Sequence, residues 1–315
     1  MFIKSPLNYT GNKYRILPQI TKFFPKHTKV FVDMFCGGAT VGFNVNADKI
    51  ILIDNNPRVI NLLKYLAEKD INIIISKIEK IIEKYNLSYS YKHTYKKYRE
   101  AGYVIGNNGL KEFNREGFYR LRKDYNNLKN KNTEKANTML YTLMVYAFNN
   151  DIRFNYQGDF NLPVGKTDFN KNNYNKLIAY NNRAREIDYE FVCTDFRSKK
   201  AEEILKKATF IYCDPPYLIT TAVYNENGGW NNDMERDLLI LLKKSNIKNI
   251  PFALSNVLKT KLKTNLQLET WINDNNYEIH KIKYHYRSSS YNKKNRDREE
   301  QEILVTGINN NEASN

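Results

Sequence analysis

The sequence of 315 residues is poor in the features that mark secreted, zinc-binding and membrane proteins. It has three cysteines (Cys36, Cys193 and Cys213) with no CxxC pair and no paired Cys/His spacing, so we expect reduced, buried thiols and no metal site. No apolar run approaches the roughly 20 residues of a membrane-spanning helix. Residues 1–6 contain no apolar segment of a secretion signal, so we expect a cytoplasmic protein with no membrane partner.

Acidic residues are also in deficit. There are 34 Asp and Glu against 50 Lys and Arg, which gives a formal net charge of +16 and a pI near 9.4. This excess favours a polyanionic partner, and nucleic acid is preferred over an acidic membrane surface because no segment could span a bilayer. Hydrophobic residues still make up 41% of the chain, which is enough to form a real core.

The most informative stretch is the apolar run 209–213 followed by Asp214, Pro215, Pro216 and Tyr217. The run predicts a buried strand, and the two prolines end it because they fix their own φ and lack a backbone N–H. Open α/β sheets bind ligands at the carboxyl ends of their strands. At this point a carboxylate and a carbonyl could accept hydrogen bonds from the exocyclic amine of a planar base, and an aromatic face could stack on its ring. Taken alone, a simple Pro-Pro turn with Tyr217 in the core is an equally good interpretation.

A second pattern lies near the N-terminus. Residues 30–33 predict a strand, followed by a tight turn with Gly37 and Gly38 and an apolar helix over 41–45. The turn is not GxGxxG, which favours a smaller adenosine-bearing cofactor over a dinucleotide. The next predicted strand, 49–54, ends at Asp54, where a carboxylate commonly binds ribose hydroxyls. A helix-capping role is the alternative for Asp54, and the glycine turn favours the ribose role.

The rest of the chain divides into an insertion and a returning sheet. We predict an insertion at 61–185. It comprises helical periodicity over 59–85, a basic tyrosine-rich stretch over 88–135, an apolar helix over 138–148 and a β-hairpin over 149–166. Further strands are predicted at 189–193, 251–257, 278–286 and 301–305. We therefore predict an α/β, Rossmann-like fold with catalytic parts at 1–60 and 186–308 and a disordered tail at 309–315. Between the last two strands, residues 281–298 carry seven Lys/Arg against one Asp, a composition suited to a phosphate backbone.

The order of these motifs resembles the α-class DNA adenine-N6 methyltransferases of the Dam family, with the phage type the most similar. The resemblance is carried by 8–13 (Asn-Tyr-Thr-Gly-Asn-Lys), 33–38 (Asp-Met-Phe-Cys-Gly-Gly), Asp54, the insertion and 214–217. The hairpin residues from Arg153 to Lys166 and the run 302–304 (Glu-Ile-Leu) strengthen it.

The resemblance implies S-adenosylmethionine as the cofactor of a Rossmann-like methyltransferase sheet. Tyr9 and Lys13 would line its pocket, Asp33, Phe35 and Gly37 would surround the methionine end, Asp54 would hold the ribose, and Phe196 would flank the adenine ring. The resemblance also implies the target. Asp214 and the Pro215 carbonyl, followed by Pro216, would accept hydrogen bonds from N6 of a flipped adenine, on which Tyr217 would stack.

The inserted, mostly helical domain would recognise the target in double-stranded DNA, the expected partner. Arg153 is the candidate for guanine, Pro163 for a thymine methyl group, and Asn155 and Lys166 lie on the same hairpin. Ser288, Lys293 and Arg296 of the basic loop would contact phosphates. The resemblance implies the palindrome GATC. Two residues depart from the family pattern and bear on the recognition sequence. Many bacterial members have Lys where this chain has Asn8, and close phage relatives have Arg where it has Thr167.

Two enzymatic alternatives share parts of the pattern. An RNA adenine-N6 methyltransferase would have the glycine turn but is not expected to have the insertion, and a DNA cytosine-N4 methyltransferase more often has Ser before the prolines. A DNA-binding module without activity would not need the glycine turn, Asp54 and Asp214 together. The resemblance further implies a monomer or weak dimer, associated with the nucleoid of a prokaryote or with a phage or virus. A cognate restriction endonuclease acting separately is a compatible partner.

Overall fold

The computed structural model describes most of the chain and divides it into two compact units. The described residues are 2–8, 11–104, 106–219, 229–283 and 301–307, so Tyr9, Ser288, Lys293, Arg296 and the tail 309–315 lie outside them. The helical unit comprises 1–12, 37–43 and 56–191, and the sheet unit comprises 13–36, 44–55 and 192–315. Among the described residues, no helix combines the length and apolar character needed to cross a bilayer.

The sheet has seven strands in the order β3-β2-β1-β4-β5-β7-β6. β1 pairs in parallel with β2 and β4, β4 pairs in parallel with β5, and β7 runs antiparallel between β5 and β6. The strands are β1 (Thr28–Asp33), β2 (Ala47–Asp54), β3 (Tyr189–Cys193), β4 (Phe210–Cys213), β5 (Phe252–Lys259), β6 (Glu278–Lys281) and β7 (Gln301–Gly307). This α/β, Rossmann-like sheet confirms the predicted fold class.

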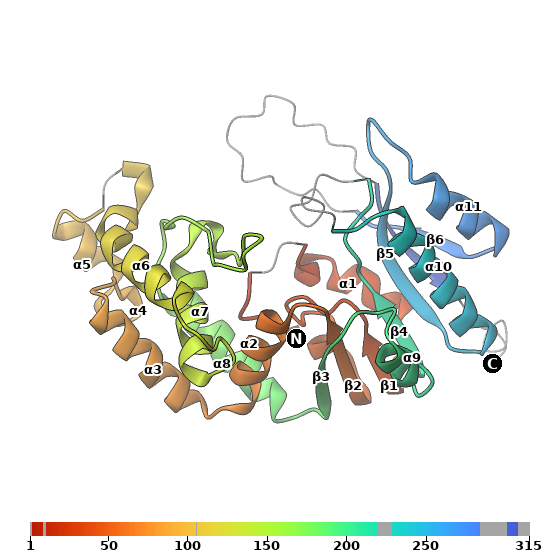
Figure 1. Ribbon diagram of the computed structural model, residues 1–315, viewed down its shortest axis with the longest axis horizontal. Helices are drawn as coiled ribbons and strands as arrows, with labels where there is room; N and C mark the ends of the chain where they lie inside the picture. The colour runs from red at the N-terminus through yellow and green to blue at the C-terminus, as the bar shows by residue number, and fades with distance from the viewer. Residues whose placement is uncertain (1, 9–10, 105, 220–228, 284–300, 308–315) are drawn as a thin grey trace. The chain divides into compact units, whose positions relative to one another are not determined.

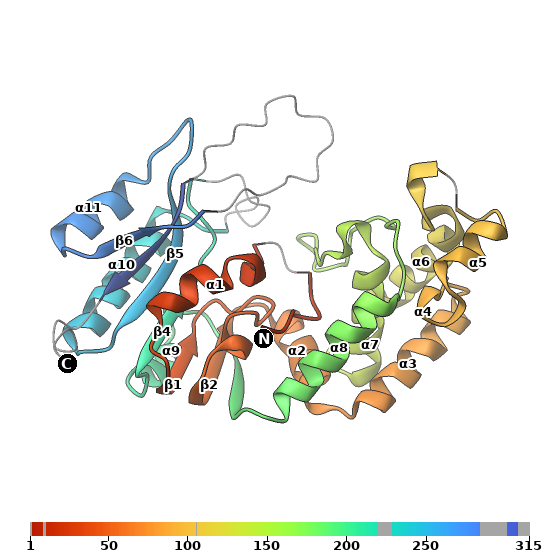
Figure 2. The ribbon, with the colours of Figure 1, turned by 180° about the vertical axis from the view of Figure 1, so that it is seen from behind.

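Alternating side chains bury both faces of the central strands. Val32 and Ile211 belong to the core that includes Leu238 and Leu242 of α10 (Asn232–Ile247). Phe31 and Tyr212 point the other way, within 5.8 Å and 5.4 Å of the Phe24 ring. Figures 1 and 2 show α9 (Lys199–Leu205) and α10 on one face of the sheet and α1 (Leu17–Ile20) on the other. A further helix, α11 (Leu266–Asp274), follows β5.

The helical unit is built around α7 (Glu134–Tyr146), whose side chains from Ala136 onward are all buried. Its other helices are α2 (Pro57–Glu68), α3 (Ile71–Lys84), α4 (Ser90–His93), α5 (Tyr95–Glu100), α6 (Lys111–Asn126) and α8 (Lys171–Ala184). Short polar side chains start several of these helices: Asn56 caps α2 and Asp70 caps α3 by accepting hydrogen bonds from backbone N–H groups.

Four local predictions need correction. The glycine turn is followed by a single 3-10 turn, η3 (Gly42–Asn44), and not by a helix over 41–45. Cys193, predicted to be buried, is exposed because it ends β3, a strand at the edge of the sheet. The hairpin has isolated antiparallel bridges, Phe154 to Phe160 and Ala147 to Val164, in place of a regular ladder. The predicted strand 278–286 ends at Lys281 as β6, and residues 284–286 lie outside the described part.

Candidate active site

The candidate catalytic residues of the sheet unit lie at one edge of the sheet. Asp33 ends β1, Asp54 ends β2 and Asp214 follows β4 directly, and these three strands are parallel neighbours. In the sheet, β2 and β3 lie on one side of β1, and β4 lies on its other side. The strand order therefore reverses between β1 and β4. Ligands of open α/β sheets bind outside the carboxyl ends of the strands at such a reversal.

Asp214 is held by a buried ion pair. Lys13 Nζ lies 2.8 Å from Asp214 Oδ2, and the two side chains are 3% and 18% exposed. The Tyr217 hydroxyl donates to Asp214 Oδ1 over 3.1 Å. Burial raises the pKa of Asp214 and the nearby Glu302 carboxyl raises it further, whereas the Lys13 ammonium lowers it. The carboxyl is therefore placed by two donors in a site with little water.

The backbone before Asp214 is rigid. Cys213 is fully buried, and the Tyr212 hydroxyl shares a hydrogen bond of 2.8 Å with Ser255 Oγ of β5. The Tyr212 carbonyl accepts a hydrogen bond from Met34 N, which ties the end of β4 to the residue after β1. Pro215 and Pro216 cannot extend the ladder, so the strand ends at the acid as predicted.

The carboxyls at the ends of β1 and β2 both act on Cys36. Burial raises the pKa of the Cys36 thiol well above its usual value, and the charges of Asp54 and Asp33 add to this. Burial also raises the pKa of the Cys213 thiol, and the charges of Asp33 and Asp214 add to it. The segment that follows β2 caps α2 through Asn56, which accepts hydrogen bonds from Arg58 N and Val59 N, so Asn56 and not Asp54 is the N-cap.

Three aromatic rings form a cluster beside these acids. Phe35 and Phe196 have ring centroids 5.4 Å apart, and Trp230 lies 5.6 Å from each of them. Trp230 Nε1 donates to Glu235, a buried carboxylate that also accepts from Asn256 and Asn265. Phe196 and Phe35 were candidates from the sequence. Trp230 was missed, because its position in the fold depends on α10 and not on a local motif.

A cavity of about 370 Å³ between α9 and α10 is a different feature. Its lining includes Phe196, Leu205, Leu241 and Ile250, but none of the acids at the ends of β1, β2 and β4. This cavity is therefore not the candidate active site.

The glycine turn belongs to the helical unit. Gly37 has φ of 47° and Ala39 has φ of 57°, a region that favours glycine. Ser5 Oγ donates to the Gly38 carbonyl over 2.6 Å. In the same unit Lys176 Nζ donates to Asn8 Oδ1 over 2.7 Å. A lysine ammonium thus lies beside residue 8, although the chain has Asn at the position where many Dam-family members have Lys.

The hairpin brings together all four of its candidate residues. Arg153 is exposed, and its Nε donates to Asn161 Oδ1 over 2.8 Å. Asn155 closes the turn by accepting from Asp159 N, while Pro163 and Lys166 are exposed. Their side chains are thus presented from one element of the helical unit.

Neighbouring helices brace this hairpin. The Arg58 guanidinium of α2 donates to the Gly158 carbonyl and lies 4.5 Å from the centre of the Phe154 ring. Asn126 of α6 pairs with both the N–H and the carbonyl of Phe160. Arg58 and Asn126 were not singled out from the sequence, because they act on a segment far away along the chain.

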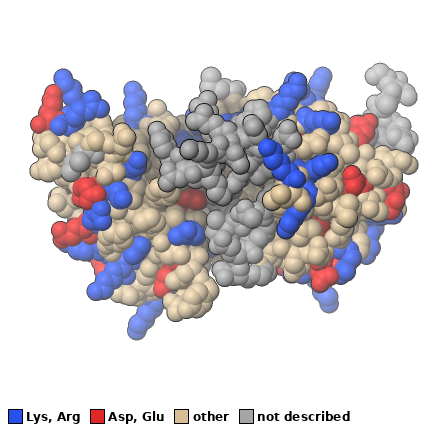
Figure 3. Space-filling view, turned by 90° about the horizontal axis from the view of Figure 1, so that it is seen from above, with Lys and Arg blue, Asp and Glu red and all other residues tan. Residues whose placement is uncertain are grey.

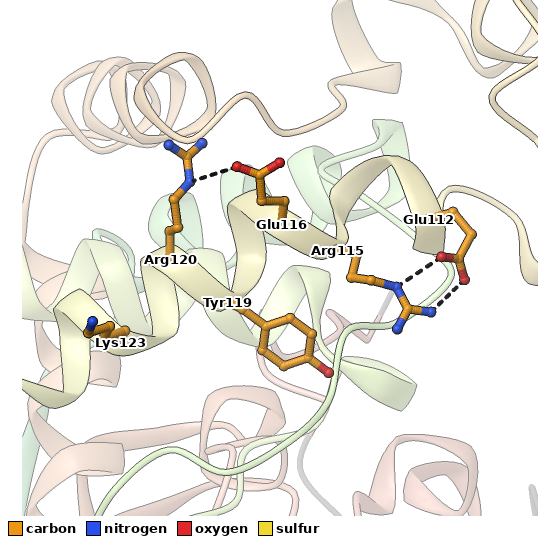
Figure 4. A pocket seen from close by; sticks show the side chains of 6 residues that line it. All are labelled: Glu112, Arg115, Glu116, Tyr119, Arg120 and Lys123. Atoms are coloured by element: carbon orange, nitrogen blue, oxygen red, sulfur yellow. Dashed lines mark hydrogen bonds and ion pairs between the residues drawn. The ribbon is translucent and has the colours of Figure 1, made fainter.

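Basic side chains are not all equally suited to bind a polyanion. Figure 3 shows Lys and Arg side chains scattered over the visible surface, with Asp and Glu among them. On α6, however, two of the three basic side chains that line a shallow hollow of about 530 Å³ face glutamates: Arg115 contacts Glu112, and Arg120 lies 3.9 Å from Glu116 (Figure 4). This part of α6 is therefore a weaker candidate for phosphate contact than the hairpin.

Comparison with known proteins decides the family. The sequence profile described as D12 class N6 adenine-specific DNA methyltransferase matches residues 9–298. The chain belongs to this family. The predicted resemblance to DNA adenine-N6 methyltransferases is confirmed.

The relatives of this D12-class chain include modification methylases. It is 38% identical to the Type II methyltransferase M.FokI of Planomicrobium okeanokoites and 34% identical to the modification methylase StsI of Streptococcus sanguinis. These matches cover 98% and 97% of this chain but 43% of each relative, so the chain spans less than half of their length. The DNA adenine methylase of Haemophilus influenzae is 26% identical over 72% of this chain and 68% of its own.

The fold and the family leave the roles of individual residues as predictions. The sheet unit brings together Lys13, Asp33, Asp54, Asp214 and Tyr217, and the helical unit presents the hairpin. Tyr9 and the phosphate-contact candidates of the basic loop lie outside the described residues. In the described part of the chain, no group of three or more His, Cys, Asp or Glu side chains is arranged to hold a metal ion.

Proposed function

We propose that this chain transfers a methyl group from S-adenosylmethionine to N6 of an adenine flipped out of double-stranded DNA. The observation that carries the proposal is Asp214, held at the carboxyl end of β4 by the buried ammonium of Lys13. The Pro215 carbonyl and the Tyr217 ring follow it within three residues. A carboxylate, a carbonyl and an aromatic face are the groups needed to hold the amine of a planar base.

The residues at this edge of the sheet fit S-adenosylmethionine. Asp33 and Asp54 supply carboxylates suited to its ammonium and ribose hydroxyls, and both act on the pKa of Cys36 between them. Phe196 supplies an apolar ring face suited to its adenine, and Phe35, assigned to the methionine end, has its ring centroid 5.4 Å from that of Phe196. When bound, this cofactor supplies a methyl group on a positively charged sulfur. Tyr9, Lys13, Gly37 and Asp214 complete the set that the resemblance assigns to it.

The chain's own residues would prepare the nucleophile. An aromatic amine is a poor nucleophile because its lone pair is delocalised into the ring. Hydrogen bonds from its N–H groups to Asp214 and to the Pro215 carbonyl favour a pyramidal nitrogen whose lone pair points out of the ring plane. Each Asp214 oxygen has a second acceptor site beyond its contact with Lys13 or Tyr217. The reaction then depends on positioning and on fixed charge.

We assign recognition of duplex DNA to the helical insertion 61–185, whose braced hairpin presents Arg153, Asn155, Pro163 and Lys166. A guanidinium can bond guanine O6 and N7 together, and an exposed proline can contact a thymine methyl group. GATC remains the sequence that the Dam resemblance predicts. Action as a monomer or weak dimer in the cytoplasm, beside a separate restriction endonuclease, belongs to the same proposal.

The test is methyl transfer from labelled S-adenosylmethionine to duplex DNA, to duplex RNA or to neither, followed by nucleoside analysis. We expect N6-methyladenine in DNA. Asp214→Ala should lower the rate by a factor on the order of 10² or more, and Asp274→Ala, an exposed acid of the same unit, should leave it unchanged. Label in RNA or as N4-methylcytosine would support one of the alternative enzymes instead.

A second readout addresses the recognition sequence. Expression in a host without DNA methylation, followed by single-molecule sequencing, maps every methylated adenine. Methylation confined to GATC would support the Dam-type prediction. Any other motif would overturn GATC without affecting the proposed chemistry.

A further inference from the structure

Glu302 reaches the candidate active site from the last strand of the sheet. β7 runs antiparallel to β5, with Glu302 opposite Val257 near the end of β5. The first residues of β7 therefore lie at the edge where the parallel strands end. The Glu302 side chain is only 3% exposed, although it carries a carboxyl group.

The carboxyl of Glu302 faces the groups that hold Asp214. Its Oε1 lies 3.6 Å from Lys13 Nζ and 3.1 Å from the Tyr217 hydroxyl, and its Oε2 has no hydrogen-bond partner among the described residues. The charge of Glu302 raises the pKa of Tyr212 of β4, as it does that of Asp214. One ammonium is thus shared by two buried carboxyls.

Tyr217 and Lys13 each contact both carboxyls. The Tyr217 hydroxyl has one proton and lies 3.1 Å from Asp214 Oδ1 and 3.1 Å from Glu302 Oε1, so it donates between the two oxygens. Lys13 Nζ is closer to Asp214, at 2.8 Å, than to Glu302, at 3.6 Å. The two donors that hold Asp214 are therefore in contact with Glu302 as well.

We propose that Glu302 is a positioning residue for methyl transfer. It accepts from the Tyr217 hydroxyl and attracts the Lys13 ammonium, and it thereby fixes the two groups that contact Asp214. Asp214 then stays oriented toward the target amine, and the Tyr217 ring is held for stacking. The inference rests on the proposed function, because it concerns the rate of that reaction.

The test compares Glu302→Ala, Glu302→Gln and the exposed control Glu203→Gln in single-turnover methyl transfer to duplex DNA. Glu302→Ala should lower the rate constant about 10- to 100-fold, the scale of a misplaced reacting group. Glutamine keeps the size of glutamate and an acceptor oxygen for the Tyr217 hydroxyl, so Glu302→Gln should be at least about fivefold faster than Glu302→Ala. Affinities for DNA and cofactor and the thermal midpoint should change little in Glu302→Gln.

The split between kcat and KM separates positioning from packing. In steady-state assays Glu302→Ala should lower kcat and leave the KM for duplex DNA within about twofold of wild type, because Glu302 contacts the groups that hold Asp214. An alanine variant at wild-type rate would overturn the inference alone, as would a glutamine variant as slow as alanine. If the wild-type protein transferred no methyl group at all, both this inference and the proposed function would fail.

Discussion

Replacing Lys13 by methionine tests the buried ion pair most directly. Methionine retains the length and apolar stem of lysine but removes a cation that contacts both Asp214 and Glu302. Breaking a buried pair on one side leaves the other charge uncompensated, which typically costs about 3–5 kcal/mol. We expect a loss of this size in the free energy of unfolding at neutral pH.

The loss should depend on pH in a defined direction. Burial already raises the pKa of Asp214, and Lys13 opposes that shift. Without Lys13, the pKa of Asp214 in the folded state rises further above its unfolded value. At pH values above this pKa, the ionised carboxyl destabilises the folded protein. As the pH falls through this raised pKa, the folded protein takes up the proton and the difference between variant and wild type shrinks.

Fluorescence offers a local readout. Both tryptophans, Trp230 and Trp271, lie in the sheet unit, so their emission during urea unfolding reports on the unit that contains Lys13. Lys206→Met is the matched control, because Lys206 is half-exposed and pairs only with exposed glutamates of α9. The control midpoint should equal that of wild type. A Lys13→Met loss below about 1 kcal/mol, or one that does not shrink on acidification, would refute the reasoning.

Three further predictions concern DNA. Tyr217→Ala should slow transfer to duplex more than transfer to a substrate whose target base is already unpaired, and equal losses would assign Tyr217 to packing. Arg153→Ala should cost about 1–3 kcal/mol of discrimination at one guanine, visible as methylation of near-sites by sequencing, whereas an unchanged motif would remove Arg153 from that role. Arg58→Met loses the contacts with Gly158 and Phe154. It should weaken duplex binding in a filter assay without changing cofactor affinity; an unchanged DNA affinity would show that the hairpin needs no brace.

The sequence by itself determined the features that depend on short stretches of chain. Pro215 and Pro216 end β4 wherever that strand lies, because proline acts on its own backbone. The acids that end β1 and β2 could be located for a similar reason, since apolar strand patterns stop at them. The order of these motifs also sufficed for the family, which the profile match confirmed.

Local patterns were less reliable where packing competes with them. The apolar run after the glycine turn was predicted as a helix, but only the 3-10 turn Gly42–Asn44 forms before β2 begins at Ala47. A helix-capping role was the less favoured alternative for Asp54 on sequence grounds, and in the structure the cap of α2 is Asn56.

Only the tertiary structure decided which side chains meet. Lys13 and Glu302 lie at opposite ends of the sequence, and they meet because β7 inserts antiparallel between β5 and β6 and starts at the edge where β4 ends. Arg58 meets the hairpin only through the packing of α2 in the helical unit. Such partners follow from strand order and helix packing, which depend on contacts across the whole chain rather than on the residues next to each side chain.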